Sequence, residues 1–204
     1  MTLHSSEPKP GAPAPRSPET LDFLRRRRSR PAKTLTAPVP DRPALTDLLA
    51  IAARTPDHGK LEPWRFLVLE KPALDRLAGL VPERGAALGL EGEKIDKMQR
   101  QFAQADLAIC VVASPKLSDK IPEVEQLLSA GAVCYGLLTA ALAAGWGANW
   151  LTGWAAHDRV FVERHLGLTP RESVAGFIHV GTETTAPPER PRPDVAAITS
   201  WISA

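Results

Sequence analysis

The sequence has few cysteines and almost no net charge. Its 204 residues include two cysteines, Cys110 and Cys134, and 25 Lys and Arg residues stand against 23 Asp and Glu residues. Two cysteines without CxxC or metal-finger spacing exclude a disulfide scaffold, and their apolar surroundings predict buried thiols in a reducing compartment. A net charge of +2 gives no chain-wide field for nucleic acid, so polyanion binding would need a local basic cluster.

The N-terminus lacks the apolar core of a secretory signal. Residues 1–16 are polar and rich in proline, which predicts a disordered leader on a cytoplasmic protein. Residues 126–156 carry no charged side chain and exceed the ~20 residues that span a bilayer. Because their apolar content is largely Ala and Gly and no basic flank adjoins them, we expect a buried helix and strand instead. Residues 17–204 are predicted to form a single domain.

Proline spacing and hydrophobic periodicity predict alternating helices and strands. None of the twenty prolines lies between Glu123 and Thr169, so the middle of the chain is expected to be regular. This alternation favours helix-sheet-helix layering over a bundle or barrel. The proline-rich tail from Thr182 ends in Ile198 and Trp201, and we expect it to pack on another surface such as a partner subunit. Helices are expected over 17–30, from 41, around 74–95, from 122 and over 159–166, and strands over 66–69, 107–113, 146–152 and 173–180.

A basic cluster follows the first expected helix. Five arginines occupy six positions from Arg25 to Arg30, interrupted by Ser29. Guanidinium forks match phosphate oxygens, and a serine hydroxyl adds a short donor, so phosphate binding is one interpretation and a solvated arginine face is the other. Nucleic-acid binding is a third, although only Phe23 lies nearby to stack on bases.

A loop of fixed conformation leads into the strand expected at residue 66. Residues 54–66 contain two prolines, a glycine and the donors Arg54, His58 and Lys60. Loops at strand ends commonly hold binding groups, but a single loop histidine can equally bond to neighbouring backbone. Since no second His or Cys stands at metal-ligand spacing, no metal site is assigned.

The third cluster surrounds the long uncharged segment. Small residues from Ser129 to Gly131 permit close approach of a second backbone, and the segment 145–153 contains Trp150, Thr152 and Gly153. An aromatic wall with accessible backbone groups suits a flat ligand. The alternative is an Ala-rich core helix followed by a core tryptophan.

In this order, the three clusters resemble the FMN-dependent nitroreductase family, and especially its small bacterial members. The matching motifs are Arg-Arg-Ser, Pro-Asp-His-Gly…Pro-Trp-Arg-Phe and a Ser-Ala-Gly helix that leads to Gly-x-Asn-Trp-x-Thr-Gly, and the likeness runs from about Leu21 to Trp201. The resemblance implies an α+β fold: a three-layer helix-sheet-helix sandwich with four or five mostly antiparallel strands. It also implies a homodimer with FMN at the interface and the C-terminal tail on the partner subunit.

The same resemblance implies an NAD(P)H-dependent oxidoreductase. Hydride would pass from NADH or NADPH to FMN and on to a nitroaromatic, a quinone or a similar small acceptor. The hydride step needs no side-chain nucleophile or acid, so no catalytic residue is assigned, and neither nucleic acid nor membrane is an expected partner. Residues 140–145 match a stretch associated with nicotinamide-nucleotide binding, and Arg190 is a weaker phosphate candidate. By position, the implied cofactor-binding residues are Arg27, Arg28, Ser29, Arg54, His58, Trp150, Leu151, Thr152 and Arg192, with Arg54 and His58 reaching the flavin of the other subunit.

Two positions depart from the family pattern. Pro31 stands where many relatives place a basic residue at the flavin ring edge, and Lys33 is the candidate replacement. Leu151 stands where some compact members have arginine. Two other functions remain open: a protein that uses its arginine cluster on nucleic acid or an anionic surface, and a flavin-binding protein without reductase turnover.

Overall fold

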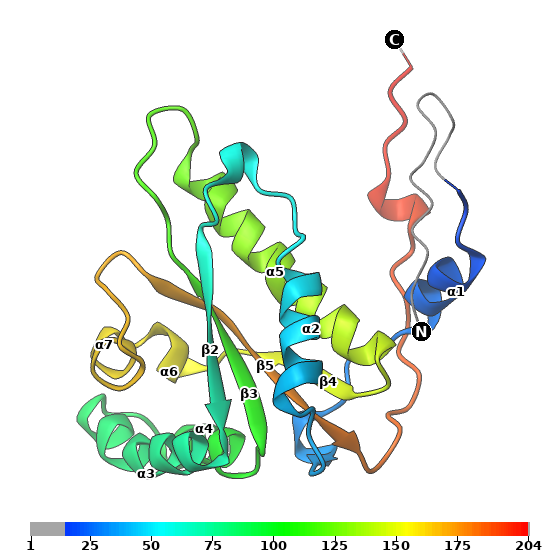
Figure 1. The fold of residues 1–204 in the computed structure, drawn as a ribbon. Helices are drawn as coiled ribbons and strands as arrows, with labels where there is room; N and C mark the ends of the chain where they lie inside the picture. Colours follow the sequence, from blue (N-terminus) through cyan, green and yellow to red (C-terminus); the bar gives the residue numbers. More distant parts are fainter. Residues whose placement is uncertain (1–14, 204) are drawn as a thin grey trace.

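A five-stranded antiparallel sheet forms the centre of the molecule in the computed structural model, which describes residues 15–203 (Figure 1). Residues 1–14 of the expected leader lie outside the described residues. Strand β3 (Leu107–Ala113) pairs with β2 (Trp64–Glu70) on one side and with β5 (Ser173–Glu183) on the other. Strand β5 also pairs with β4 (Gly147–Leu151) through residues 177–181 and with the short β1 (Leu35–Thr36) through residues 182–183.

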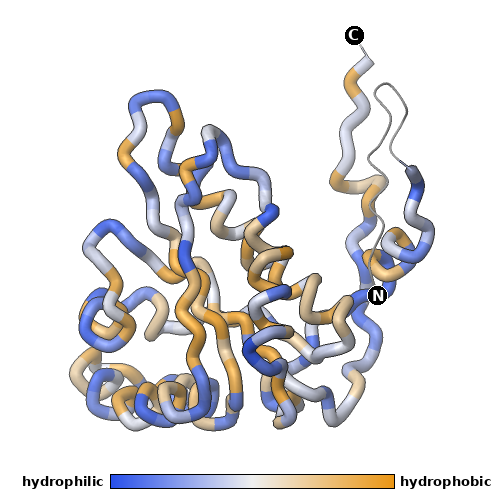
Figure 2. The backbone as a smooth tube through the Cα atoms, in the orientation of Figure 1, coloured by the Kyte–Doolittle hydropathy of each residue, from blue (hydrophilic) through white to orange (hydrophobic). Residues whose placement is uncertain are grey.

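Helices cover both faces of this sheet. One face packs on α2 (Arg42–Ala52) and α5 (Glu123–Ala143), and the other packs on α3 (Lys71–Ala87), α4 (Gly92–Ala103), α6 (Trp154–His157) and α7 (Arg159–Leu166). Every residue of β3 is buried because both faces of that strand are covered. Figure 2 shows the result: apolar residues gather in the central strands, and polar residues dominate the outer loops. The structure therefore confirms the predicted three-layer arrangement.

The two ends of the described chain stand beside this body. Helix α1 (Pro18–Arg26) buries none of its residues, and the C-terminal segment runs alongside it, as Figure 1 shows. The tail contains the short helix η3 (Ala196–Ile198), and residues 188–203 are all exposed. Its apolar residues are thus presented to solvent in a single chain, most of all Trp201, whose exposed fraction is 93%.

Local sequence signals fix several helix ends. The carboxylate of Asp41 accepts a hydrogen bond from the amide of Ala44, 2.9 Å away, and so caps α2 as the Asp-Arg-Pro sequence predicts. Asp158 caps α7 in the same way through the amide of Phe161, at 2.7 Å. Gly167, with φ of +68°, ends α7 in the left-handed conformation.

Several element predictions need correction. Helix α1 ends at Arg26 and does not continue to residue 30, because Arg27 adopts an extended ψ of 142°. The pattern around 74–95 is two helices, since the chain turns at Gly89 with φ of +66°. The four-residue α6 and the two-residue β1 were missed because each is too short for periodicity to reveal.

Helix α5 corresponds to the uncharged segment of the sequence. It is the one helix among the described residues that is long and apolar enough to cross a membrane, and half of its most apolar window is buried inside the molecule. Core helices of globular proteins meet the same test of length and composition. Its buried residues, including Val133, Cys134 and Leu137, pack against the sheet as a core helix does.

Candidate functional site

The arginine segment after α1 lies along strand β4. The amide of Arg30 donates a hydrogen bond to the carbonyl oxygen of Ala148 at 2.8 Å, and Nδ2 of Asn149 donates to the carbonyl oxygen of Arg30 at 2.5 Å. Because α1 ends at Arg26, residues 27–30 are free to extend beside β4. The fold thus brings the predicted segment Arg27–Ser29 next to the strand that carries Trp150.

An open cavity of about 320 Å³ lies at the start of β4. The guanidinium of Arg27 stacks over the ring of Tyr135, 5.5 Å from its centroid, while its Nε is buried and has no hydrogen-bond partner among the described residues. Arg30 pairs with Glu183 at 3.3 Å. The unpartnered Nε is suited to an anionic ligand. Residues lining the cavity are Phe23, Arg26, Arg27, Arg28, Arg30, Leu142, Gly145, Trp146 and Glu183.

The C-terminal tail adds a further arginine, Arg192, to this cluster. Arg28 donates a hydrogen bond to the carbonyl oxygen of Pro188 and lies 3.9 Å from a carboxylate oxygen of Glu189. Glu189 also pairs with Arg192 at 3.1 Å. One carboxylate therefore holds the predicted residues Arg28 and Arg192 at the same place, although 164 positions separate them in the sequence.

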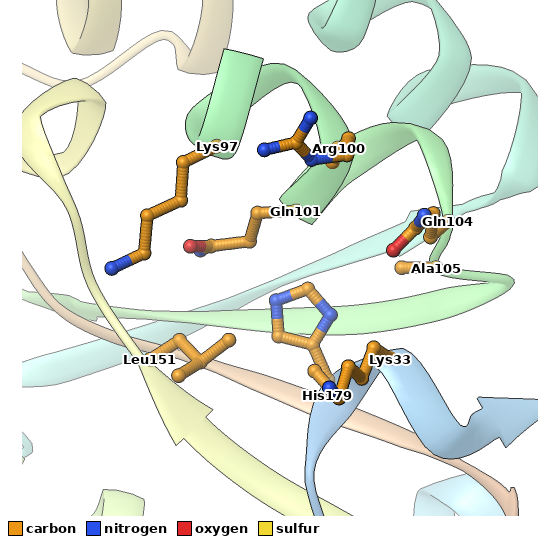
Figure 3. Close-up of a pocket in the computed structure, with 9 residues that line it drawn as sticks. Lys33, Lys97, Arg100, Gln101, Gln104, Ala105, Leu151 and His179 are labelled. Atoms are coloured by element: carbon orange, nitrogen blue, oxygen red, sulfur yellow. The ribbon is translucent and has the colours of Figure 1, made fainter. Parts of the chain in front are cut away.

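A second cavity, of about 290 Å³, lies at the other end of β4 (Figure 3). It is open to solvent and lies between α4, the end of β4 and the short helix η1 (Ala32–Thr34), with β5 as its floor. Three cations line it and no carboxylate does, so its field is positive. Residues lining it are Ala32, Lys33, Lys97, Arg100, Gln101, Gln104, Ala105, Leu151 and His179.

The end of β4 presents alternate residues to opposite faces of the sheet. Leu151 lines the second cavity, whereas Trp150 packs over Gly176, where a β-carbon would lie 2.0 Å from the indole nitrogen. That nitrogen donates to the carbonyl oxygen of Ala175 at 3.2 Å. The Trp150 ring is therefore on the α5 face of the sheet and forms no wall of this cavity. The carbonyl oxygen of Thr152 accepts a hydrogen bond from Nε2 of Gln101 at 2.9 Å, which ties the strand end to α4.

His179 is a candidate that sequence reasoning missed. Its side chain is 1% exposed on β5, points toward α4 in Figure 3, and finds no hydrogen-bond partner for either ring nitrogen among residues 15–203. Burial lowers the pKa of this imidazole to about 4, so it is neutral near pH 7. The only signal in the sequence was a single histidine inside an otherwise apolar strand.

Arg54 and His58 lie elsewhere on the same chain. Nδ1 of His58 is hydrogen bonded to Oε2 of Glu125 at 2.6 Å, near the first turn of α5. Arg27 instead contacts Tyr135, ten residues further along that helix, which corresponds to about 15 Å along the helix axis. A single chain thus brings Arg27, Arg28, Ser29, Leu151, Thr152 and Arg192 to β4 and leaves His58 near the opposite end of α5. Arg54 follows α2, and the adjacent Thr55 lies beside Gly136 in the middle of α5.

The cysteines form no reactive or metal-binding group. Both Cys110 and Cys134 are buried and free, and burial raises the pKa of Cys134 to about 12 and that of Cys110 further above its ordinary value. Within the described part of the chain, no cluster of three or more His, Cys, Asp or Glu side chains could hold a metal ion.

Comparisons with known proteins converge on one group. The sequence profile described as "Nitroreductase family" matches residues 24–182. The Escherichia coli (strain K12) protein named "Putative NAD(P)H nitroreductase YdjA" is 32% identical over 164 residues, which cover 80% of this chain and 88% of that protein. A Haemophilus influenzae protein, "Putative NAD(P)H nitroreductase", is 35% identical over 166 residues, with the same coverage of both chains.

Solved structures share the fold. A nitroreductase-like family protein from Bacillus cereus superposes with a TM-score of 0.76 at 21% identity, over 95% of this chain and all of that one. A Desulfovibrio desulfuricans protein, described as a putative nitroreductase in complex with FMN, gives a TM-score of 0.70 at 22% identity, over 93% of this chain and all of that one.

Proposed function

Because the chain belongs to the nitroreductase family, we propose that it is an FMN-dependent oxidoreductase that takes hydride from NADH or NADPH and passes it to a small acceptor such as a nitroaromatic or a quinone. The observation that carries this proposal is the pair of cavities at the two ends of β4. One is lined by arginines, including the unpartnered Nε of Arg27, and the other contains the unpartnered imidazole of His179. The arginine-lined cavity suits the phosphate group of such a ligand.

The choice of cofactor and hydride donor follows the relatives. The Desulfovibrio desulfuricans protein was solved in complex with FMN, and the Escherichia coli protein is named for NAD(P)H. When bound, FMN supplies the hydride-accepting ring, and the protein supplies binding, orientation and electrostatics.

Different residues around β4 would bind the phosphate and the ring of FMN. Arg27, Arg28 and Ser29, with Arg192 from the tail, would hold the phosphate through charge-assisted hydrogen bonds. Leu151 and the backbone at Thr152 would support the ring, and Lys33, Lys97 and Arg100 would stabilise negative charge that develops on it during reduction. Lys33 lines the ring cavity, so it can supply the positive charge that Pro31 lacks.

We propose that the active form is a homodimer. Helix α5 exposes Val124, Leu127, Leu128 and Tyr135, and the tail exposes Trp201, which together leave much apolar surface uncovered. A partner packed on α5 would cover it and could bring its own Arg54 and His58 toward this chain's flavin. Residues 17–204 then act as one domain, with residues 1–16 as its leader.

The test uses purified full-length protein. We expect FMN to bind with quenching of its fluorescence, and NADH or NADPH to be consumed continuously once a nitroaromatic or quinone is added. Binding of FMN without steady-state turnover would indicate a flavin store and overturn the reductase activity. No FMN binding, together with tight salt-dependent binding of polyanions that is lost when Arg25–Arg28 become alanine, would support the arginine-cluster alternative.

A further inference from the structure

Two side chains of α5 hold the loop that carries His58, which lies beside the start of that helix (Figure 1). Oγ of Ser129, a buried residue, donates a hydrogen bond of 2.8 Å to the carbonyl oxygen of Pro56 and accepts one of 3.2 Å from the indole of Trp64. One turn earlier, Oε2 of Glu125 lies 2.6 Å from Nδ1 of His58. Because residues i and i+4 share one face of a helix, α5 contacts both the backbone before His58 and the ring itself.

Hydrogen bonds within the loop constrain it further. The carboxylate of Asp57 accepts a hydrogen bond of 2.7 Å from the amide of Glu62, and the carbonyl oxygen of the same residue accepts one of 3.3 Å from the amide of Lys60. Asp57 directly precedes His58, so these bonds close the turn around the histidine. The backbone at His58 is therefore fixed, and Glu125 sets the direction of its ring.

The contact between His58 and Glu125 lies at the surface of a single chain. The exposed fractions of the two side chains are 63% and 45%, and an exposed pair of this kind contributes little to stability. Val124, Leu127 and Leu128, next to Glu125 on α5, belong to the apolar surface assigned above to the partner subunit. A partner that covers them would also remove water from the contact and strengthen it.

The carboxylate determines which nitrogen of the ring is left to bind a ligand. An ionised glutamate only accepts hydrogen bonds, so Nδ1 of His58 must carry the hydrogen in either protonation state of the ring. Nε2 remains for another group, as an acceptor in the neutral ring and as a donor in the imidazolium. The edge of a flavin ring offers both an N–H donor and carbonyl acceptors, so it can pair with Nε2 in either state.

We propose that Glu125 is a positioning residue whose carboxylate holds His58 through Nδ1 and directs Nε2 toward the flavin of the partner subunit. This inference rests on the proposed function and on the proposed homodimer. Within one chain, Tyr135, which contacts Arg27, lies ten residues beyond Glu125, or about 15 Å along the helix axis. Glu125 need not touch the flavin, and its effect on FMN binding passes through His58.

A double-mutant cycle tests that dependence. Wild type, Glu125→Ala, His58→Ala and the double variant are titrated with FMN by fluorescence quenching. We expect each single variant to raise the Kd for FMN about three- to tenfold. The double variant should match His58→Ala, because Glu125 has nothing to position once the imidazole is gone. Glu125→Gln retains an oxygen acceptor and should recover part of the affinity.

Glu123→Ala is the matched control. It removes the same charge from the first turn of α5, but Glu123 pairs with Arg171, at 3.4 Å, and not with the loop. We expect this variant to bind FMN as wild type does. Light scattering at the concentration of the titration checks that each variant keeps the mass of wild type.

A second measurement reports the position of the hydrogen on the ring. Long-range ¹H–¹⁵N spectra of the histidine rings, recorded where the rings are neutral and assigned with His58→Ala, should show the His58 hydrogen on Nδ1 in wild type. Glu125→Ala should lose this preference. In wild type, the Nε2 signal of His58 should shift on addition of FMN.

The outcomes separate the positioning role from the proposed function. If wild type does not bind FMN, the proposed function fails. If wild type binds FMN, the function stands, and the role of Glu125 is wrong if Glu125→Ala binds as tightly as wild type, if the two single effects add in the double variant, or if the His58 hydrogen in wild type is on Nε2. A loss of affinity that accompanies dissociation of Glu125→Ala into monomers would assign Glu125 to assembly and would also overturn the proposal.

Discussion

Gln101 and Thr152 join two layers of the molecule at the candidate ring site. Nε2 of Gln101, on α4, donates a hydrogen bond of 2.9 Å to the carbonyl oxygen of Thr152, directly after β4. The next residue, Gly153, has φ of +112°, and a β-carbon there would lie 2.8 Å from the sulfur of Met98. The backbone at the end of β4 is thus held tightly against α4, beside the second cavity.

Removal of the Gln101 amide should loosen this contact. In Gln101→Ala the Thr152 carbonyl loses its donor, and we expect the Kd for FMN to rise about three- to tenfold. Gln104→Ala is the control, since Gln104 lines the same cavity and its side chain makes no hydrogen bond within residues 15–203. Equal affinities of the two variants, measured by fluorescence quenching, would disprove a specific role for the Gln101 bond.

The arginines of the first cluster should differ in their effect. Arg27→Ala and Arg28→Ala remove donors at the cavity beside β4, and each should weaken FMN binding about ten- to a hundredfold, as expected for hydrogen bonds to a charged phosphate. Arg25 is exposed and does not line that cavity, so Arg25→Ala should leave the Kd within about twofold of wild type. Isothermal titration calorimetry at fixed salt distinguishes this pattern from a uniform loss, which would indicate general electrostatic attraction.

The buried ion pair between Arg65 and Glu172 should contribute more to stability than the exposed pair between Glu123 and Arg171. Glu172 is buried, and Nε and Nη2 of Arg65 donate to its two carboxylate oxygens at 2.7 and 2.8 Å. Glu172→Gln should lower the free energy of unfolding by about 1–3 kcal/mol. Glu123→Gln breaks an exposed pair with Arg171 and should change the free energy of unfolding by less than about 1 kcal/mol. Urea unfolding measures both, and similar losses would contradict the assignment.

Stability of the apo protein should depend on pH in two windows. The pKa of His179 is lowered to about 4 by burial, so below its ordinary value of 6.5 the unfolded chain binds a proton that the folded chain does not. The free energy of unfolding should therefore fall from pH 6.5 to 4, by on the order of 3 kcal/mol, and His179→Phe should flatten this slope. The hydrogen bonds from Arg65 lower the pKa of Glu172 to about 2, so a second loss should follow between pH 4.5 and 2. An unchanged slope in His179→Phe would show that other groups cause the first loss.

The exposed tail should matter for assembly. If Trp201 packs on a partner subunit, Trp201→Ala should weaken the dimer and shift light-scattering mass toward the monomer at micromolar concentration. Leu88 is also exposed but lies at the end of α3, on the opposite side of the sheet from α5, so Leu88→Ala should have no effect on mass. A wild-type protein that is monomeric at all concentrations would refute the proposed homodimer and, with it, a flavin site built from two subunits.

Sequence patterns predicted the elements that have long periodicity. β3 was predicted at its observed bounds because its residues are all apolar and three of the seven are β-branched, and α2 was marked by Asp41 and Pro43. The predicted C-terminal end of α1 was wrong, because nothing in a run of arginines indicates that the chain leaves the helix at Arg27 and extends beside β4. That departure is a tertiary effect, which depends on hydrogen bonds between Arg30 and residues 148–149.

The sequence predicted only those candidate site residues that belong to a recognisable motif. In the structure the arginine segment, Leu151 and Thr152 lie at β4, and Glu189 links Arg192 to Arg28. His179, Gln101, Lys97 and Arg100 were not predicted as site residues, because the positions facing one cavity from β5 and α4 follow from packing and not from spacing. The roles of Arg54 and His58 stay predictions, since they depend on a second subunit.

The most direct test of hydride transfer through a bound flavin is an absorbance spectrum of the FMN-loaded protein, recorded without oxygen before and after addition of NADH and, separately, of NADPH. We predict that at least one of the two bleaches the visible flavin band, and that addition of a quinone or nitroaromatic restores it. A band that persists with both nucleotides, in protein that holds FMN tightly, would contradict the central claim that this chain passes hydride through a bound flavin.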